Sequence, residues 1–182
     1  MKRMLLILLT TVVCASPAFG QAGYIGLFSD AGFTDCSMVD IPGVRTIYAV
    51  HKAASGVSAS QFMVEVDAGM TCASLGTINY FPTTIGTPEN GISIAYGSCL
   101  VSDIVLFEWT WSCSGTSLPC SRLEVVPDWG SISGTIEVVD CYSQKMIGNG
   151  SIMYVNANFG CDCGIVVPAT PASWGQIKAL YK

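Results

Sequence analysis

Eight of the nine cysteines lie between residues 36 and 163, and this even number constrains the fold more than any other feature of the sequence. The chain has one histidine, His51, and no Cys-x-x-Cys pair, so the cysteines do not match the spacing of a zinc site. An even set in an exported chain predicts up to four disulfides. We expect these residues to be the disulfide partners: Cys36, Cys72, Cys99, Cys113, Cys120, Cys141, Cys161 and Cys163.

The first twenty residues predict a secretory signal peptide. Lys2 and Arg3 give a positive start, residues 4–13 form an apolar run, and small residues at 16–20 form the exit. The apolar run is too short to span a bilayer. We expect cleavage after Gly20, with Ala22 as the alternative, and no membrane span in the processed chain. The ninth cysteine, Cys14, lies inside this segment.

The charge balance excludes one class of partner. Removal of residues 1–20 leaves six basic and thirteen acidic residues, which gives a formal charge of −7. Nucleic-acid binding requires clustered Lys and Arg, and the six that remain are scattered between Arg45 and Lys182. We therefore expect no nucleic-acid partner.

Short β-rich runs alternate with Gly, Pro, Ser, Asp and Asn clusters from residue 24 to residue 165. In 61–67 and in 105–111, apolar and polar side chains alternate with the period of two of a half-buried strand. The pattern predicts an all-β, antiparallel two-sheet β-sandwich over residues 21–165. Nine strands are expected, at residues 24–29, 44–52, 61–67, 75–81, 91–96, 105–111, 121–126, 134–140 and 150–155.

Residues that favour turns separate the predicted strands, and the segment after the last strand has the pattern of a linker and a helix. Asn149-Gly150 gives the strongest hairpin signal. Residues 166–182 are predicted to form a proline-containing linker and a short C-terminal amphipathic helix that opens at Ser173. Its apolar face would carry three candidate partner-binding residues, Trp174, Ile177 and Tyr181.

Few residues suit catalysis. A Ser-His-Asp arrangement would have to use His51, and the sequence contains no Gly-x-Ser-x-Gly turn, so we expect a neutral structural histidine. Glu65 and Asp67 share one face of a strand, which is the ordinary position of solvent-facing acids. The loop acids near residues 30–40 do not match an EF-hand. We expect no enzyme, no catalytic residue, no cofactor and no metal.

Aromatic residues give the better binding hypothesis, because a sugar ring or an apolar side chain can stack on an exposed ring. Trp129 occupies a Pro-Asp-Trp-Gly turn and is the first candidate ligand-binding residue; Tyr80 and Phe81 are the second. Among the cysteines, Cys113 and Cys120 are expected to close a small loop together.

Cys161 and Cys163 are too close in sequence to bond each other easily, so each is expected to pair elsewhere. Cys36 and Cys141 are their plausible partners. Eight cysteines allow 105 pairings, and the sequence does not select one.

Two resemblances extend this interpretation. Residues 24–30, 59–62, 136–141 and 173–181 resemble a group of uncharacterised secreted bacterial proteins, which implies no activity. Residues 56–62, 90–94 and 104–107 resemble cohesin-like and carbohydrate-binding jelly-roll β-sandwiches. Cohesin-like domains bind short helical partner modules, so this resemblance implies an extracellular adhesion or scaffolding role. The eight cysteines depart from the usual cohesin pattern.

The sequence thus favours an exported, non-catalytic binding or display module that is secreted to the periplasm, the cell surface or the extracellular space. A glycan or an extracellular protein is the expected partner, and the oligomeric state is open. The alternatives are a structural envelope or matrix subunit and, less favoured, a secreted glycan hydrolase.

Overall fold

The computed structural model describes residues 22–161, 163 and 165–166. This part of the chain contains one 3-10 helix, η1 (Pro88–Asn90), and otherwise strands and loops. The strands are β1 (Tyr24–Phe28), β2 (Ser37–Met38), β3 (Gly43–Val66), β4 (Ala73–Asn79), β5 (Thr83–Thr87), β6 (Gly91–Cys113), β7 (Ser121–Val126), β8 (Ile136–Asp140), β9 (Lys145–Val155) and β10 (Ile165–Val166).

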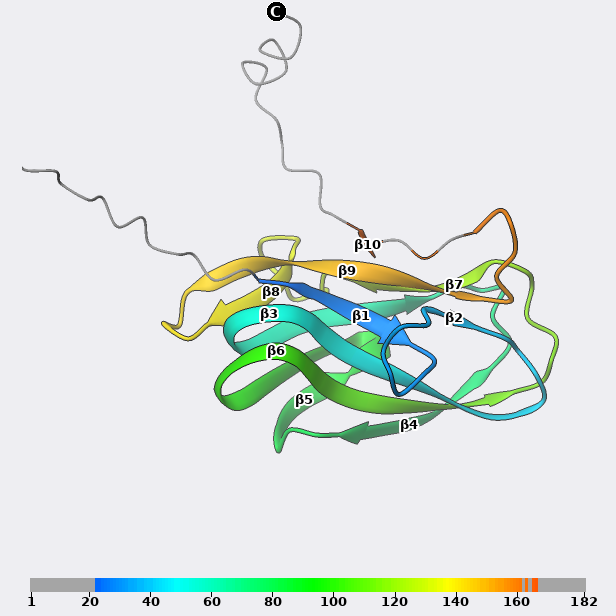
Figure 1. Cartoon of the computed structure of the whole chain (residues 1–182), viewed down its shortest axis with the longest axis horizontal. Helices are drawn as coiled ribbons and strands as arrows, with labels where there is room; N and C mark the ends of the chain where they lie inside the picture. The colour runs from blue at the N-terminus through cyan, green and yellow to red at the C-terminus, as the bar shows by residue number, and fades with distance from the viewer. Residues whose placement is uncertain (1–21, 162, 164, 167–182) are drawn as a thin grey trace, which may run out of the picture.

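The two longest strands, β3 and β6, pair antiparallel along nearly their whole length and bend together. The register shifts between Ala49 and Ala59, and both strands curl back at one end of the molecule (Figure 1, left). Positive φ angles at Ala53, Gly56 and Ser102 accompany this bend. Each strand therefore contributes one half to each layer of a β-sandwich.

The neighbours of each half complete the two layers. The first half of β3 and the second half of β6 lie with β1 and β4. The second half of β3 and the first half of β6 lie with β5, β7 and β8. We call these the β4 layer and the β5 layer, after the strand at the edge of each.

Strand β9 connects the layers on the opposite side from β4 and β5. Its first residues pair with β8, its last with β7, and Asn149 and Gly150 pair in parallel with β1. The predicted hairpin at Asn149-Gly150 is therefore wrong, because this dipeptide lies inside a strand. Glycine is needed there for a close approach: a Cβ on Gly150 would lie 2.1 Å from the carbonyl oxygen of Val125.

Large aromatic side chains fill the space between the layers. Phe62 stacks on Phe107 with ring centroids 6.3 Å apart, and Trp109 contacts Trp111 at 4.5 Å. All four rings are buried, and each removes roughly 150–250 Å² from water. The pairing of β3 with β6 places Ile47 opposite Trp109 on the same inner face. The core thus depends on the long β3–β6 ladder.

The predicted fold class is confirmed: the described chain is nearly all β and forms a two-layer antiparallel sandwich. The predicted strands at 44–52 and 61–67 are parts of β3, and those at 91–96 and 105–111 are parts of β6. Strands β2, β5 and β10 were not predicted. The expected C-terminal helix lies outside the described residues. Within them, the structure has no helix long and apolar enough to span a membrane.

We predict that Gly150→Ala destabilises the protein, because the added methyl group would overlap the Val125 backbone. The expected loss in the free energy of unfolding is about 2–3 kcal/mol, measured by chemical denaturation of the oxidised protein. Gly130→Ala is the matched control, since its Cβ would meet no atom closer than 3.5 Å. Equal stability of the two variants would contradict the close approach of Gly150 to the Val125 backbone.

Candidate functional site

His51 is a fully buried structural residue. One ring nitrogen, Nε2, bonds the carbonyl oxygen of Ala22, and Nδ1 lies 2.8 Å from the hydroxyl of Tyr96. Because a carbonyl only accepts, Nε2 carries the hydrogen and Nδ1 accepts from Tyr96. Burial lowers the pKa of His51 and so favours the neutral ring. This agrees with the expected neutral, structural role.

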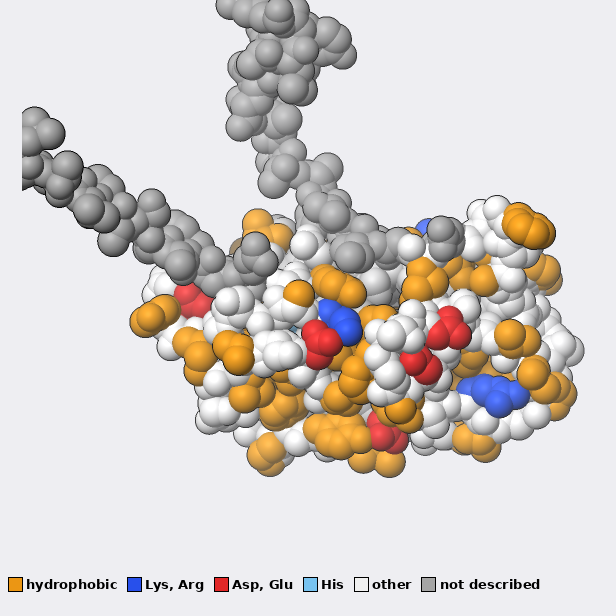
Figure 2. Space-filling model, viewed as in Figure 1, with side chains coloured by type: hydrophobic (Ala, Val, Ile, Leu, Met, Phe, Trp, Pro, Cys, Tyr) orange, Lys and Arg blue, Asp and Glu red, His pale blue; other side chains and the backbone are white. Residues whose placement is uncertain are grey.

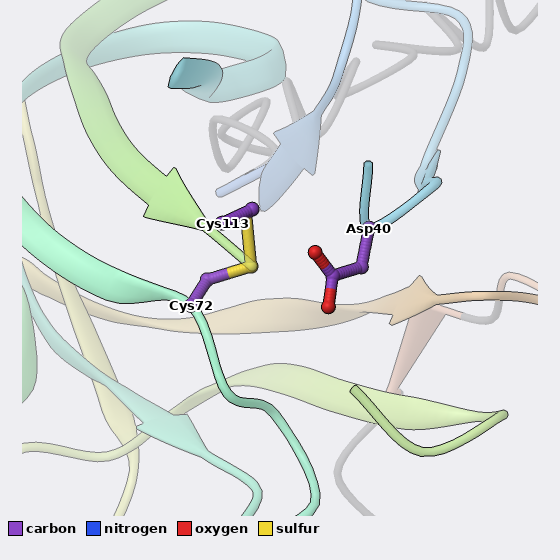
Figure 3. Close-up of side chains that lie close together, drawn as sticks. All are labelled: Asp40, Cys72 and Cys113. Carbon is purple, nitrogen blue, oxygen red and sulfur yellow. A yellow bond between two sulfur atoms is a disulfide. The ribbon is translucent and has the colours of Figure 1, made fainter. Parts of the chain in front are cut away.

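Asp40, Cys72 and Cys113 form the one group of potential metal ligands found among the described residues, with their ligand atoms within 4.8 Å of one another. Figure 3 shows the Asp40 carboxylate directed toward the two sulfur atoms. The sulfurs are joined in a disulfide, however, and a metal needs thiolates. In its oxidised state this cluster is a buried cross-link beside a carboxylate.

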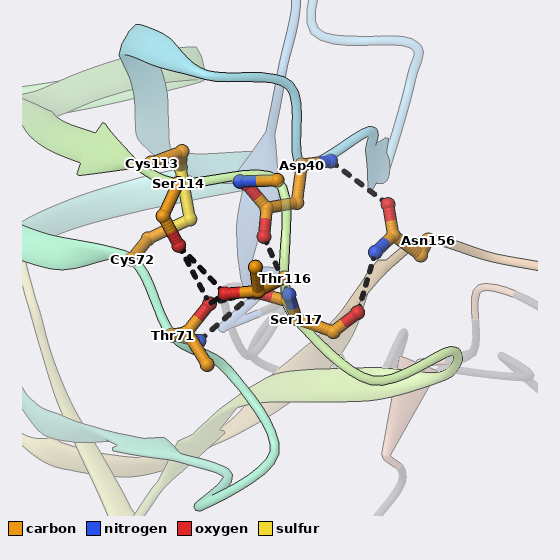
Figure 4. The surroundings of a disulfide bond; sticks show 9 residues. Asp40, Thr71, Cys72, Cys113, Ser114, Thr116, Ser117 and Asn156 are labelled. Atoms are coloured by element: carbon orange, nitrogen blue, oxygen red, sulfur yellow. Dashed lines mark hydrogen bonds between the residues drawn. A yellow bond between two sulfur atoms is a disulfide. The ribbon is translucent and has the colours of Figure 1, made fainter.

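The Asp40 carboxylate holds the loop after β6 (Figure 4). It accepts hydrogen bonds from the backbone amides of Gly115 at 2.8 Å and Ser117 at 2.7 Å. Asn156 accepts from the Asp40 amide and donates to the Ser117 carbonyl, each at 2.9 Å. The network joins the segment before β3, the loop after β6 and the end of β9.

Two opposing effects set the pKa of Asp40, which is only 7% exposed. Burial raises the pKa, but hydrogen bonds from Ser117, Gly115 and Thr116 outweigh it and leave the pKa below its ordinary value. The charged form is therefore the one that the fold stabilises.

The disulfides correct one predicted pairing and confirm part of another. Cys113 does not pair with Cys120: Ala73 lies opposite Ser112, so Cys72 and Cys113 are the next pair in the β4–β6 register. Cys161 and Cys163 do pair elsewhere. Cys36 is a partner as expected, whereas Cys141 bonds Cys99 instead. The four bridges are Cys36–Cys163, Cys72–Cys113, Cys99–Cys141 and Cys120–Cys161.

The outer face of the β5 layer carries a hollow that we call the trough. Cross-strand partners in a sheet project to the same side, so the registers define two parallel rows of side chains. One row crosses the strands as Ile85, Ser93, Gln61, Glu137 and Ile147. The other crosses them as Thr83, Ala95, Ala59, Val139 and Lys145.

Small side chains on the central strands, Ala59, Ser93 and Ala95, form the floor of the trough. Larger ones line both sides: Ile85 on β5, which is largely exposed, and Val139 on β8 with Lys145 on β9. The hollow between them has a volume of about 230 Å³. It carries one ion pair, between Lys145 and Glu137, at 2.6 Å.

Residues 127–135, here called the flap, interrupt the row of strands beside β3. β8 pairs with β3 up to Gln61, β7 continues the pairing from Met63, and the flap leaves the sheet between them. Asp128 accepts a hydrogen bond from Gln61 at 2.5 Å. Ser131 and Ser133 donate to Glu137 at 3.4 and 3.1 Å. These bonds fix the flap to one end of the trough.

The flap presents Trp129 to solvent with 82% of its surface exposed, and Ile132 is fully exposed. The structure therefore places the first candidate binding residue on the flap, which bonds two residues that line the trough, although Trp129 itself does not line it. The other two lie elsewhere. Phe81 packs on Tyr96 with centroids 5.0 Å apart, against the core, while the Tyr80 hydroxyl donates to Glu108 on the outside of the β4 layer.

Trp174, Ile177 and Tyr181 lie outside the described residues and stay a prediction. Of the acids considered for catalysis, Glu65 lies opposite Glu124 on the exposed surface, and Asp67 accepts a hydrogen bond from the amide of Gly69. Neither lines the trough.

No protein-family model matches this chain, and no curated protein sequence does. Among solved structures, the sixth cohesin of scaffoldin B from Acetivibrio cellulolyticus is similar over 76% of this chain and 100% of its own, with a TM-score of 0.51 and 14% identity. A non-cellulosomal cohesin from Archaeoglobus fulgidus covers 74% of this chain and 84% of its own, with a TM-score of 0.46 and 11% identity. The first similarity supports the predicted remote, cohesin-like fold.

We predict that Asp40→Asn lowers the free energy of unfolding by about 1–3 kcal/mol at neutral pH, because the amide leaves the loop amides without a charged acceptor. The folded-state pKa of Asp40 lies below its ordinary value of 3.8. Its stabilising effect is thus complete above that value and is lost as the pH falls through the folded-state pKa. Denaturation curves should therefore show a difference in the free energy of unfolding between the native protein and Asp40→Asn at pH 7, and this difference should become smaller below about pH 4. A difference that does not change with pH would contradict this role of Asp40.

Proposed function

We propose that this chain is an exported, non-catalytic binding module that captures a protein partner in the trough. The observation that carries the proposal is the trough itself: a floor of small side chains, larger apolar side chains at its margins, and a flap that is bonded to Gln61 and Glu137 and carries the exposed Trp129. The four disulfides support maturation in an oxidising compartment, as does the signal-like first segment.

The width of the trough suits an α-helix. Ile85 on β5 and Val139 on β8 are separated by three strand spacings, or about 14 Å. An α-helix with its side chains is about 10–12 Å across. The small residues Ala59 and Ala95 allow a helix to approach the sheet, and apolar helix positions would cover the floor. An amphipathic helix of a partner protein is therefore the proposed ligand.

The fold similarity to a solved cohesin supports a protein partner over a glycan. The Acetivibrio cellulolyticus cohesin was solved in complex with a Cel5 dockerin, so the same architecture serves protein binding there. A glycan would instead be expected to stack on Trp129 alone, since the trough floor carries no aromatic ring. A helical protein partner would therefore contact both the trough floor and Trp129, whereas a glycan would contact Trp129 alone.

We predict that Ala95→Arg abolishes capture of the partner, because the long charged side chain would fill the floor of the trough. Pull-down with the oxidised protein, followed by calorimetry on the recovered partner, measures the effect. Ala31→Arg is the control, since it makes the same substitution in an exposed loop between β1 and β2. Unchanged binding by a folded Ala95→Arg variant would exclude the trough as the binding site.

We predict that Trp129→Ala weakens the captured complex by about 30-fold, the effect of losing an aromatic contact worth roughly 2 kcal/mol. Phe159→Ala is the matched control, because Phe159 is a fully exposed aromatic in another loop. A glycan array run with the same proteins separates the ligand classes. Glycan binding that is lost in Trp129→Ala but kept in Ala95→Arg would replace the protein partner with a sugar.

A further inference from the structure

Strand β4 is an open edge of the sandwich. Among the described residues it pairs only with β6. The Tyr80 amide donates to the Leu106 carbonyl at 3.1 Å, which continues the β4–β6 ladder beyond Asn79. Backbone groups of an antiparallel strand alternate in direction, so those of Ile78 and Tyr80 face β6. The amides and carbonyls of Thr77 and Asn79 therefore point away from the sheet.

This edge lacks two of the usual protections against pairing, charged residues and proline. Soluble proteins commonly protect edge strands with charged residues, proline or a covering segment. No charged residue occurs from residue 68 to residue 88, and β4 contains no proline. Ile78 is 61% exposed on it, and Figure 2 shows apolar side chains, with an acidic one among them, along the margin where β4 runs. A register shift between Ser74 and Gly76 limits the regular edge to residues 76–80.

A second copy of the chain fits this edge on electrostatic grounds. The chain has a net charge of −5, so most of its surface repels another copy, whereas the β4 edge contributes no charge. Two acids lie near this edge: Glu108 is opposite Ile78, one strand inward, and Glu89 lines a hollow together with Gly76 and Thr77. In an antiparallel β4–β4 pair, the two Glu108 residues would lie three strand spacings apart, about 14 Å, beyond the screening length of about 8 Å.

One register makes the edge self-complementary. With Ile78 opposite Ile78 of the second copy, Thr77 lies opposite Asn79, and these residues exchange backbone hydrogen bonds with their outward groups. The same register places Tyr80 opposite Gly76. No atom lies within 4 Å of the Cβ position of Gly76, so nothing at this position obstructs the approach of a second strand.

We propose that two copies of this chain pair antiparallel through β4, with Ile78 on the two-fold axis. The β4 layer then continues from one protomer into the other as a single sheet. The contact is isologous and closes, because both copies use the same β4 edge in the pair. The trough lies on the other layer and stays open in both protomers.

Sedimentation velocity of the full oxidised chain at about 1–100 µM, the range in which a weak dimer dissociates, tests the proposal. We expect a dimer whose dissociation constant rises about tenfold in Ile78→Lys, because two like charges then lie directly opposite each other. Val44→Lys is the matched control, since Val44 is 62% exposed on the outer face of the same layer. A native protein that is monomeric at 100 µM overturns the proposal, as does equal weakening by both variants.

A mixture of charge variants tests the register. Equimolar Ile78→Lys and Ile78→Glu should form a heterodimer tighter than either variant forms alone, because opposite charges then meet on the axis. Hydrogen exchange gives a second reading: the amides of Thr77 and Asn79 should become protected as concentration rises. A mixture no tighter than its components, or exchange independent of concentration, rules out pairing about Ile78.

Discussion

The antiparallel pairing of β3 with β6 is the constraint on which the rest of this structure depends. Because both strands bend at the same place, one ladder supplies the centre of both layers. Its inner side chains, such as Phe62 and Phe107, meet across the core. Its outer side chains in the β5 layer, such as Ala59 and Ala95, form the floor of the trough. Core and surface site are thus two faces of one ladder.

Local alternation was enough to predict the fold class but not the connectivity of the strands. A period of two identifies a strand segment from a few residues, which is why 61–67 and 105–111 were recognised. Residues 53–56 contain alanine, serine and glycine, a composition typical of a loop, and they hide the continuity of β3. The hairpin prediction at Asn149-Gly150 failed for a similar reason. Gly150 is needed for close packing against Val125, and the sequence alone does not show that these two residues are neighbours.

The candidate site was only half predictable. Trp129 is a candidate from sequence because a large aromatic in a turn is unusual; the structure shows it exposed on the flap, and its role in binding stays a prediction. The trough has no such signal, since alanines and serines at its floor match no motif. Only cross-strand register brings Ala59 and Ala95 together from positions 36 residues apart. The Cys113–Cys120 prediction failed on the same ground: Cys72 becomes the nearest partner only through the β4–β6 register.

The chain has few charged residues, and two parts of its surface, the β4 edge and the floor of the trough, carry none. Only 12% of residues are charged, and several of them are used in local pairs such as Lys52–Asp103 and Lys145–Glu137. The β4 edge and the floor of the trough are left neutral, and they belong to different layers, so occupation of one does not cover the other. A dimer formed through β4 would present two troughs on one particle. Two linked sites bind a multivalent partner far more tightly than one, because the second contact is intramolecular. Self-association at the edge would therefore increase the retention of a partner without any change in the trough.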